Sequence, residues 1–150
     1  MLFSFEQHYP NPYYLNKYLS HKKPESLTTD GGVFAKKRIL IADDEEAIRI
    51  LLATALKTYD YEIDIVENGL EAINNIYKRS YDLIITDYMM PEMDGLELTK
   101  RIRSEYPSIP ILIVTGNGPE HDLLKSGATA CITKPFSILE IQNTIKIMLK

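Results

Sequence analysis

The chain has 150 residues, of which 45% are hydrophobic and 25% charged, enough for the core of one compact domain with some residues left over. Its net charge of −4 argues against a non-specific binder of nucleic acid or acidic membranes, and its single cysteine, Cys131, excludes an intrachain disulfide and suits a reducing cytosol. The longest apolar runs have four residues, whereas a membrane-spanning helix needs about 20, and the first residues do not form a secretory signal, so we expect a cytoplasmic protein without membrane insertion.

The first 35 residues differ in composition from the rest. Residues 1–37 hold five lysines and three acids, a net charge of +2, whereas residues 38–150 hold twelve basic and eighteen acidic residues, a net charge of −6. Prolines and a Ser/Thr/Gly-rich stretch interrupt any periodic pattern there. Half of the aromatic residues also lie in this part: Phe3, Phe5, Tyr9, Tyr13, Tyr14, Tyr18 and Phe34. We predict an aromatic-rich arm and linker over residues 1–35, which packs on the following domain or on a neighbouring protomer.

From residue 36 onward, short apolar runs alternate with amphipathic stretches. Residues 38–42 are rich in branched side chains and predict a buried strand, which Asp43 and Asp44 end. Apolar residues then recur with helical spacing and predict an inward face formed by Ile48, Leu51, Leu52 and Ala55. Residues 61–66 predict a second strand. After a turn at residues 68–69, a second helix is expected to face inward with Leu70, Ile73, Ile76 and Tyr77.

The second half of this region repeats the alternation. Residues 83–86 predict a third strand that ends at Asp87, and a loop leads to a helix that runs through about residue 105. Residues 109–114 predict a fourth strand that ends at Thr115, followed by a short helix that ends near residue 127. The fifth strand, residues 130–133, is followed by Lys134. The last helix, residues 137–150, is expected to bury Ile138, Ile141, Ile145 and Met148.

Strands that alternate with helices through short connections predict an α/β fold. Right-handed crossovers then give a five-stranded parallel sheet with helices on both faces. Ligands of such sheets bind beyond the carboxyl ends of the strands. Asp43, Asp44, Asp87, Thr115 and Lys134 each follow or end a strand there, so we expect three carboxylates, a hydroxyl and an ammonium to meet at one edge.

These groups together fit phosphoryl transfer. Clustered carboxylates repel one another and need a cation, and Mg²⁺ is the expected one because it prefers a few carboxylate oxygens and keeps several waters. A carboxylate can attack phosphorus and form an aspartyl-phosphate. A lysine and a hydroxyl can then stabilise the charge on the transferred group.

At these positions the sequence resembles the receiver domain of bacterial two-component response regulators. The resemblance covers residues 38–150 and rests on motifs in a fixed order: ILIADDE at 39–45, DLIITDYMMPEMDG at 82–95, ILIVT at 111–115, GA at 127–128 and KPF at 134–136. It implies a flavodoxin-like (βα)5 receiver domain over residues 36–150, with strand order 2-1-3-4-5.

The resemblance also implies catalytic roles. Asp87 would accept the phosphoryl group as a 4-aspartylphosphate, Thr115 would supply the switch hydroxyl, and Lys134 would bind the phosphate. The bond between Lys134 and the following proline is often cis in this family.

The resemblance further implies a set of Mg²⁺ ligands. Asp44 and Asp87 would bind the ion directly, Asp43 through a water molecule and Met89 through its backbone carbonyl.

The resemblance implies partners as well. The phosphoryl donor would be a sensor histidine kinase or a histidine phosphotransfer protein in a phosphorelay, and the output would be a changed contact with a downstream effector protein. The domain would catalyse its own phosphorylation and slow autodephosphorylation without being a conventional turnover enzyme. No output domain follows the last helix in this sequence, which is either a stand-alone regulator or a receiver cut from a longer protein. For these residues we expect no direct nucleic-acid binding, and a homodimer stays open.

One position departs from the family pattern. Many receivers carry tyrosine or phenylalanine three residues before the lysine, where this chain has Cys131, most simply a small buried apolar residue. We therefore expect backbone movement of residues 115–120 and of the helix that follows them to carry most of the switching signal.

Other interpretations of the same residues remain. Asp43 and Asp44 fit a helix cap, Thr115 fits a turn, and Asp94 is expected to be a turn or cap residue. A phosphatase of the haloacid dehalogenase type also uses an aspartate nucleophile, Mg²⁺ and lysine, but it has Asp-x-Asp after its first strand and a cap insertion. A receiver-like module that has lost phosphorylation usually lacks an acid or the lysine, and none is missing here.

Overall fold

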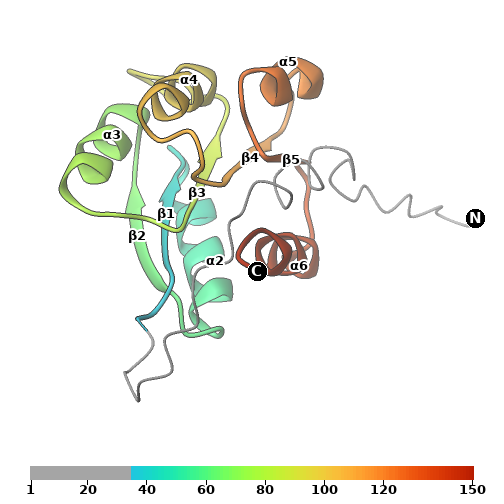
Figure 1. Ribbon diagram of the computed structural model, residues 1–150. Helices are drawn as coiled ribbons and strands as arrows, with labels where there is room; N and C mark the ends of the chain where they lie inside the picture. The colour runs from blue at the N-terminus through green and yellow to red at the C-terminus, as the bar shows by residue number, and fades with distance from the viewer. Residues whose placement is uncertain (1–34) are drawn as a thin grey trace, which may run out of the picture.

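Five strands alternate with five helices along residues 35–150, the part of the chain that the computed structural model describes (Figure 1). The strands are β1 (Arg38–Ala42), β2 (Glu62–Val66), β3 (Leu83–Asp87), β4 (Ile111–Thr115) and β5 (Ala130–Thr133). The helices are α2 (Glu46–Lys57), α3 (Gly69–Lys78), α4 (Gly95–Glu105), α5 (Glu120–Lys125) and α6 (Ile138–Met148). The predictions about the arm concern residues 1–34 and lie outside the described part. Within it, no helix is long and apolar enough to cross a membrane.

All neighbouring strands pair in parallel, in the order β2-β1-β3-β4-β5, which confirms the predicted fold class. The central strand β3 and its neighbour β4 are buried at every position, as expected for strands that helices cover on both faces. α3, α4 and α5 lie over one face, and α2 and α6 lie over the other (Figure 1). Each face has its own hydrophobic core, so the sheet is held rigidly between two layers.

The predicted inward faces of the helices are correct only in part. Ile141, Ile145 and Met148 of α6 are buried, and so are Ile73 and Ile76 of α3. The prediction is wrong for three residues, which are largely exposed: Leu51 of α2, and Leu70 and Tyr77 of α3. The buried residues of α2 keep the expected spacing but are displaced by one position along the chain: Arg49, Leu52, Ala53 and Leu56.

Three helices begin with the same local arrangement. The N-cap side chains of α3, α4 and α6 each accept a hydrogen bond from the backbone N–H three residues later. These N-cap residues are Asn68, Asp94 and Ser137. The expectation that Asp94 is a cap residue is thus confirmed.

The chain enters β1 through three consecutive basic residues. Each is paired with an acid from another segment, and the pairs are Lys36 with Asp60, Lys37 with Asp82 and Arg38 with Glu62. The pairs are largely exposed, so each contributes little to stability, but together they fix the start of β1 at the amino-terminal end of the sheet.

Candidate functional site

Three carboxylates meet at the carboxyl ends of β1 and β3. Asp43 and Asp44 directly follow β1, and Asp87 is the last residue of the neighbouring strand β3. One oxygen from each carboxylate lies within 4.8 Å of the others. The side chains of Asp43 and Asp87 are only 3% and 7% exposed, whereas Asp44 is exposed. The cluster is therefore embedded in the protein and open on one side.

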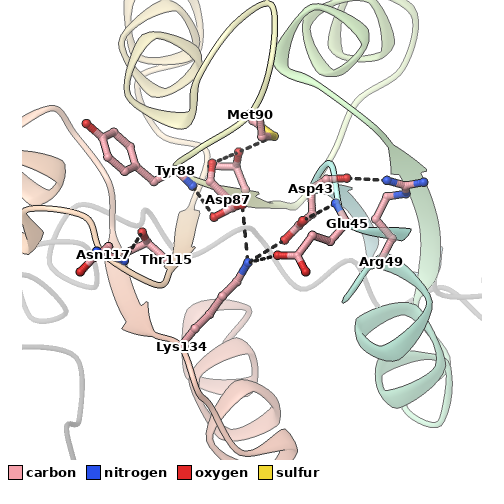
Figure 2. Close-up of polar contacts among 10 residues, drawn as sticks. Asp43, Glu45, Arg49, Asp87, Tyr88, Met90, Thr115, Asn117 and Lys134 are labelled. Atoms are coloured by element: carbon pink, nitrogen blue, oxygen red, sulfur yellow. Dashed lines mark hydrogen bonds and ion pairs between the residues drawn. The ribbon is translucent and has the colours of Figure 1, made fainter. Parts of the chain in front are cut away.

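Lys134 extends into this cluster from the end of β5 (Figure 2). Its Nζ lies 3.3 Å from Oδ2 of Asp43, 3.5 Å from Oδ2 of Asp87 and 3.5 Å from Oε1 of Glu45. The bond between Lys134 and Pro135 is cis, as the resemblance implies. One ammonium thus faces several carboxylates and balances only part of their charge.

Burial and the negative charge of the cluster together shift the pKa values of its members. Burial, with the neighbouring Asp43 carboxylate, raises the pKa of Asp87 to about 6, although Lys134 and the backbone N–H of Tyr88 act in the opposite direction. Burial also raises the pKa of Asp43. Burial disfavours the Lys134 ammonium, but Asp43 and Asp87 outweigh it, so the pKa of Lys134 is raised. Ionising both buried acids is unfavourable without a further cation.

The loop after β3 folds back on Asp87 and holds it. Oδ1 of Asp87 accepts a hydrogen bond from the backbone N–H of Tyr88 at 2.8 Å, and the Thr86 hydroxyl donates to the Asp87 carbonyl at 2.9 Å. The Gly95 N–H donates to the Tyr88 carbonyl at 2.8 Å. A Cβ atom on Gly95 would lie 2.1 Å from the Asp87 carbonyl oxygen, so this close approach requires glycine.

Thr115 ends β4 at the same edge of the sheet, next to β5. Its side chain is buried, and its Oγ1 accepts a hydrogen bond from the backbone N–H of Asn117 at 3.3 Å. Its carbonyl accepts a hydrogen bond from the Lys134 N–H at 2.7 Å. Figure 2 shows the hydroxyl bonded within its own loop, while the Lys134 ammonium points to the carboxylates.

Cys131 lies on β5 and is partly buried against the core beneath α3, α4 and α5. Burial raises the pKa of its thiol to about 11, so the sulfur is protonated at neutral pH. This agrees with the expectation of a small apolar residue. The prediction that residues 115–120 carry the switching signal stays a prediction.

The structure thus brings Asp43, Asp44, Asp87 and Lys134 together. Neither Asp43 nor Asp44 is the N-cap residue of α2, which is Glu45, but the Asp43 carboxylate accepts a hydrogen bond from the Glu45 N–H at 2.8 Å, just ahead of the helix. Met89 is exposed in the loop after β3, and the role of its carbonyl stays a prediction.

Two residues at the site have no counterpart among the predicted ones. Glu45 contacts Lys134, and its position next to two aspartates could have indicated this. Arg49 donates from Nη1 to the Asp43 carbonyl at 2.7 Å, and helical periodicity had assigned that part of α2 to apolar side chains. A sequence pattern that separates polar from apolar positions cannot detect such a residue.

Comparison with known proteins supports the resemblance to receiver domains that the sequence motifs indicate. The family model of the response regulator receiver domain matches residues 39–146. The transcriptional regulatory protein ResD of Bacillus subtilis is 40% identical over 116 residues, which cover 75% of this chain and 48% of ResD. The sensor protein EvgS of Escherichia coli K12 is 38% identical over 106 residues, which cover 69% of this chain and 9% of EvgS. The chain therefore spans less than half the length of these two relatives.

A solved structure gives the same result in three dimensions. The response regulator TrrA of Thermotoga maritima, in complex with Mg²⁺-BeF, matches with a TM-score of 0.71 and 38% sequence identity. The match covers 75% of this chain and 99% of the TrrA chain. With the family match and the sheet order, it shows that this chain belongs to the receiver domain family of two-component response regulators.

Proposed function

We propose that this receiver accepts a phosphoryl group on Asp87 from a phosphohistidine of a partner protein and then changes its contacts with an effector. The observation that carries the proposal is the position of Asp87. It is buried at the end of β3, its carboxylate lies in the acidic cluster, and Lys134 Nζ is 3.5 Å from its Oδ2. A phosphatase of the haloacid dehalogenase type is not supported, because Asp87 ends the third strand and not the first, and because the chain matches the receiver family.

The donor set fits Mg²⁺. Two buried acids and one exposed acid surround a position that Lys134 neutralises only in part. Burial, and for Asp87 also the Asp43 carboxylate, raises the pKa of the two buried acids, so a further cation would favour their ionised forms. Asp44 and Asp87 would bind the ion directly, Asp43 through water and Met89 through its carbonyl. When bound, Mg²⁺ supplies positive charge to the carboxylates and to the incoming phosphoryl oxygens.

The remaining steps use the side chains of this chain. A carboxylate oxygen of Asp87 forms a bond to phosphorus while the bond between phosphorus and the donor imidazole breaks, and the imidazole keeps the electron pair and takes up a proton. Lys134 turns from the acids to the new phosphoryl group and neutralises part of its charge. The Thr115 hydroxyl exchanges its bond within the loop for one that it donates to a phosphoryl oxygen, which draws residues 115–120 inward.

The partners follow from this reaction. The donor is a sensor histidine kinase or a histidine phosphotransfer protein, and slow autodephosphorylation resets the domain, which acts as a switch and not as a turnover enzyme. We propose a protein effector, since residues 38–150 carry a net charge of −6 and do not favour direct contact with nucleic acid.

Phosphorylation of Asp87 can be tested directly. After incubation with acetyl phosphate and Mg²⁺, intact-mass spectrometry should find one phosphoryl group on the parent and none on Asp87→Asn. Chelation of Mg²⁺ should prevent labelling of the parent. Asp122→Asn, which changes an exposed aspartate of α5, is the control and should be labelled like the parent. Labelling of Asp87→Asn at the parental level would show that the acceptor is a different residue.

We propose further that residues 1–35 form an arm that packs on the receiver or on a second copy of the chain. Burial of two of its seven aromatic side chains would contribute roughly 3–6 kcal/mol before entropy costs. Deletion of residues 1–32 should therefore leave the domain folded but lower its melting temperature or change its association state, measured as the number of copies per particle by sedimentation equilibrium. If both quantities equal those of the full chain, the arm does not pack.

A further inference from the structure

Arg49 is buried at a place where an apolar residue would be expected. Its exposed fraction is 8%, whereas Leu51 on the same helix is 44% exposed. A buried guanidinium is unfavourable unless its charge and its N–H groups find partners. Arg49 also lies in the first turn of α2, where the helix dipole disfavours a positive charge. Both the burial of the guanidinium and its position near the N-terminus of α2 are unfavourable, which indicates that the contacts of Arg49 have a function.

The short contact of Arg49 is to the backbone of the acidic cluster. Its Nη1 donates to the Asp43 carbonyl oxygen at 2.7 Å (Figure 2). Its Nη2 lies 3.9 Å from Oε1 of Glu67, whose side chain is 70% exposed, so this second contact is weak. Arg49 therefore acts mainly on the turn between β1 and α2.

Asp43, whose carbonyl accepts the bond from Arg49, makes two other hydrogen bonds. The Asp43 N–H donates to the Val66 carbonyl at 3.2 Å, and Oδ1 of Asp43 accepts from the Glu45 N–H at 2.8 Å. The bond from Arg49 holds the carbonyl that links Asp43 to Asp44. The orientation of that peptide unit sets the directions in which the two neighbouring carboxylates leave the backbone.

We propose that Arg49 is a positioning residue of the acidic site. By holding the Asp43 carbonyl, it keeps the carboxylates of Asp43 and Asp44 directed toward Asp87, in the geometry that a divalent cation needs. The inference rests on the proposed function and adds to it a residue that touches neither the cation nor the phosphoryl group.

A positioning role and a purely electrostatic role predict opposite results. If Arg49 only added positive charge near the carboxylates, its removal would strengthen Mg²⁺ binding. If Arg49 only stabilised the fold, its removal would lower the melting temperature and leave Mg²⁺ binding unchanged. If it positions the acids, its removal weakens Mg²⁺ binding, and loss of a residue that orients metal ligands typically weakens affinity by about 10- to 100-fold.

The experiment is a titration with Mg²⁺ followed through the amide chemical shifts of Asp44 and Glu45, at a pH above the pKa of Asp87. We expect Arg49→Met to weaken Mg²⁺ binding at least about tenfold and to shift the amide signals of Asp43 and Asp44 before any Mg²⁺ is added. Arg49→Lys keeps the charge but lacks the planar fork of the guanidinium, so we expect a smaller loss of about threefold. Arg101→Met is the control, because Arg101 forms an exposed pair with Glu97 on α4, and it should bind Mg²⁺ like the parent.

Equal or tighter Mg²⁺ binding by Arg49→Met would overturn the inference and leave the proposed function in place. If Arg49→Met does not fold, the inference is tested with Arg49→Lys. An affinity of that variant for Mg²⁺ equal to the parent's would overturn the inference. A parent protein that binds no Mg²⁺ would overturn the proposed function and the inference together.

Discussion

Replacement of Gly95 by alanine is expected to lower the free energy of unfolding by about 3 kcal/mol or more and to disturb phosphorylation. The added Cβ would lie 2.1 Å from the Asp87 carbonyl oxygen and 3.0 Å from the Asp87 carbonyl carbon and the Tyr88 Cα. These are backbone atoms, so no side-chain rotation can relieve the overlap. The loop after β3 must move away from α4, which displaces Asp87. Denaturant unfolding measures the first effect, and labelling with acetyl phosphate measures the second.

Gly116 provides a matched control for this experiment. It lies next to Thr115 in the loop after β4, but a Cβ there would meet only the Cβ of Lys134, at 4.0 Å, which is an ordinary contact. Gly116→Ala should therefore change the free energy of unfolding by less than about 1 kcal/mol. If Gly95→Ala were equally harmless, the close packing of Gly95 against Asp87 would be wrong.

Replacement of Asp87 by asparagine should have the opposite effect on stability. In the folded protein, burial and the Asp43 carboxylate raise the pKa of Asp87 from 3.8 to about 6. Between these values the folded state binds more protons than the unfolded state, so this residue's contribution to stability falls as the pH rises from about 4 to about 6. Above that range the ionised carboxylate lowers the free energy of unfolding by about 2–3 kcal/mol. The neutral amide of an asparagine at this position would carry no such charge.

The measurement is the difference in the free energy of unfolding between parent and Asp87→Asn, without Mg²⁺, as a function of pH. The variant should be the more stable protein at pH 7, and its advantage should disappear below about pH 4. Mg²⁺ should stabilise the parent more than the variant, because the ion relieves the repulsion that asparagine already removes. A variant that is less stable than the parent at pH 7 would contradict the raised pKa of Asp87.

The alternation of apolar runs with amphipathic stretches was sufficient to predict the order of elements from residue 38 onward. It also predicted where the polar residues of the site would gather, because parallel strands present all their carboxyl ends at one edge. Asp43, Asp87 and Lys134 could be found in this way from position alone. The individual roles proposed for them rest on the resemblance to a family, since a carboxylate at that edge can equally be a ligand, a cap or a nucleophile.

The errors concern the helices. The predicted buried face of α2 includes Leu51 because helical spacing determines a period but not its phase, and in the structure Arg49 takes the inward position instead. In that phase Arg49 Nη1 donates to the Asp43 carbonyl, a backbone group that no sequence pattern displays. In α3 the buried residues are Gly69, Ala72, Ile73 and Ile76, so Leu70 and Tyr77 each lie one position past this buried stripe.

The ion pairs at the start of β1 have a practical consequence for handling this protein. Lys36, Lys37 and Arg38 pair with acids at the amino-terminal end of the sheet, and the five residues of β1, Arg38–Ala42, lead from there to the acidic cluster. At about 3.3 Å per residue, the two ends of the strand are separated by roughly 15 Å of rigid sheet. A tag, fluorophore or surface linker joined just ahead of Ala35 therefore starts at the opposite end of the sheet from Asp87. The domain can be immobilised through that end while the edge of the sheet that carries Asp87 stays open to solution.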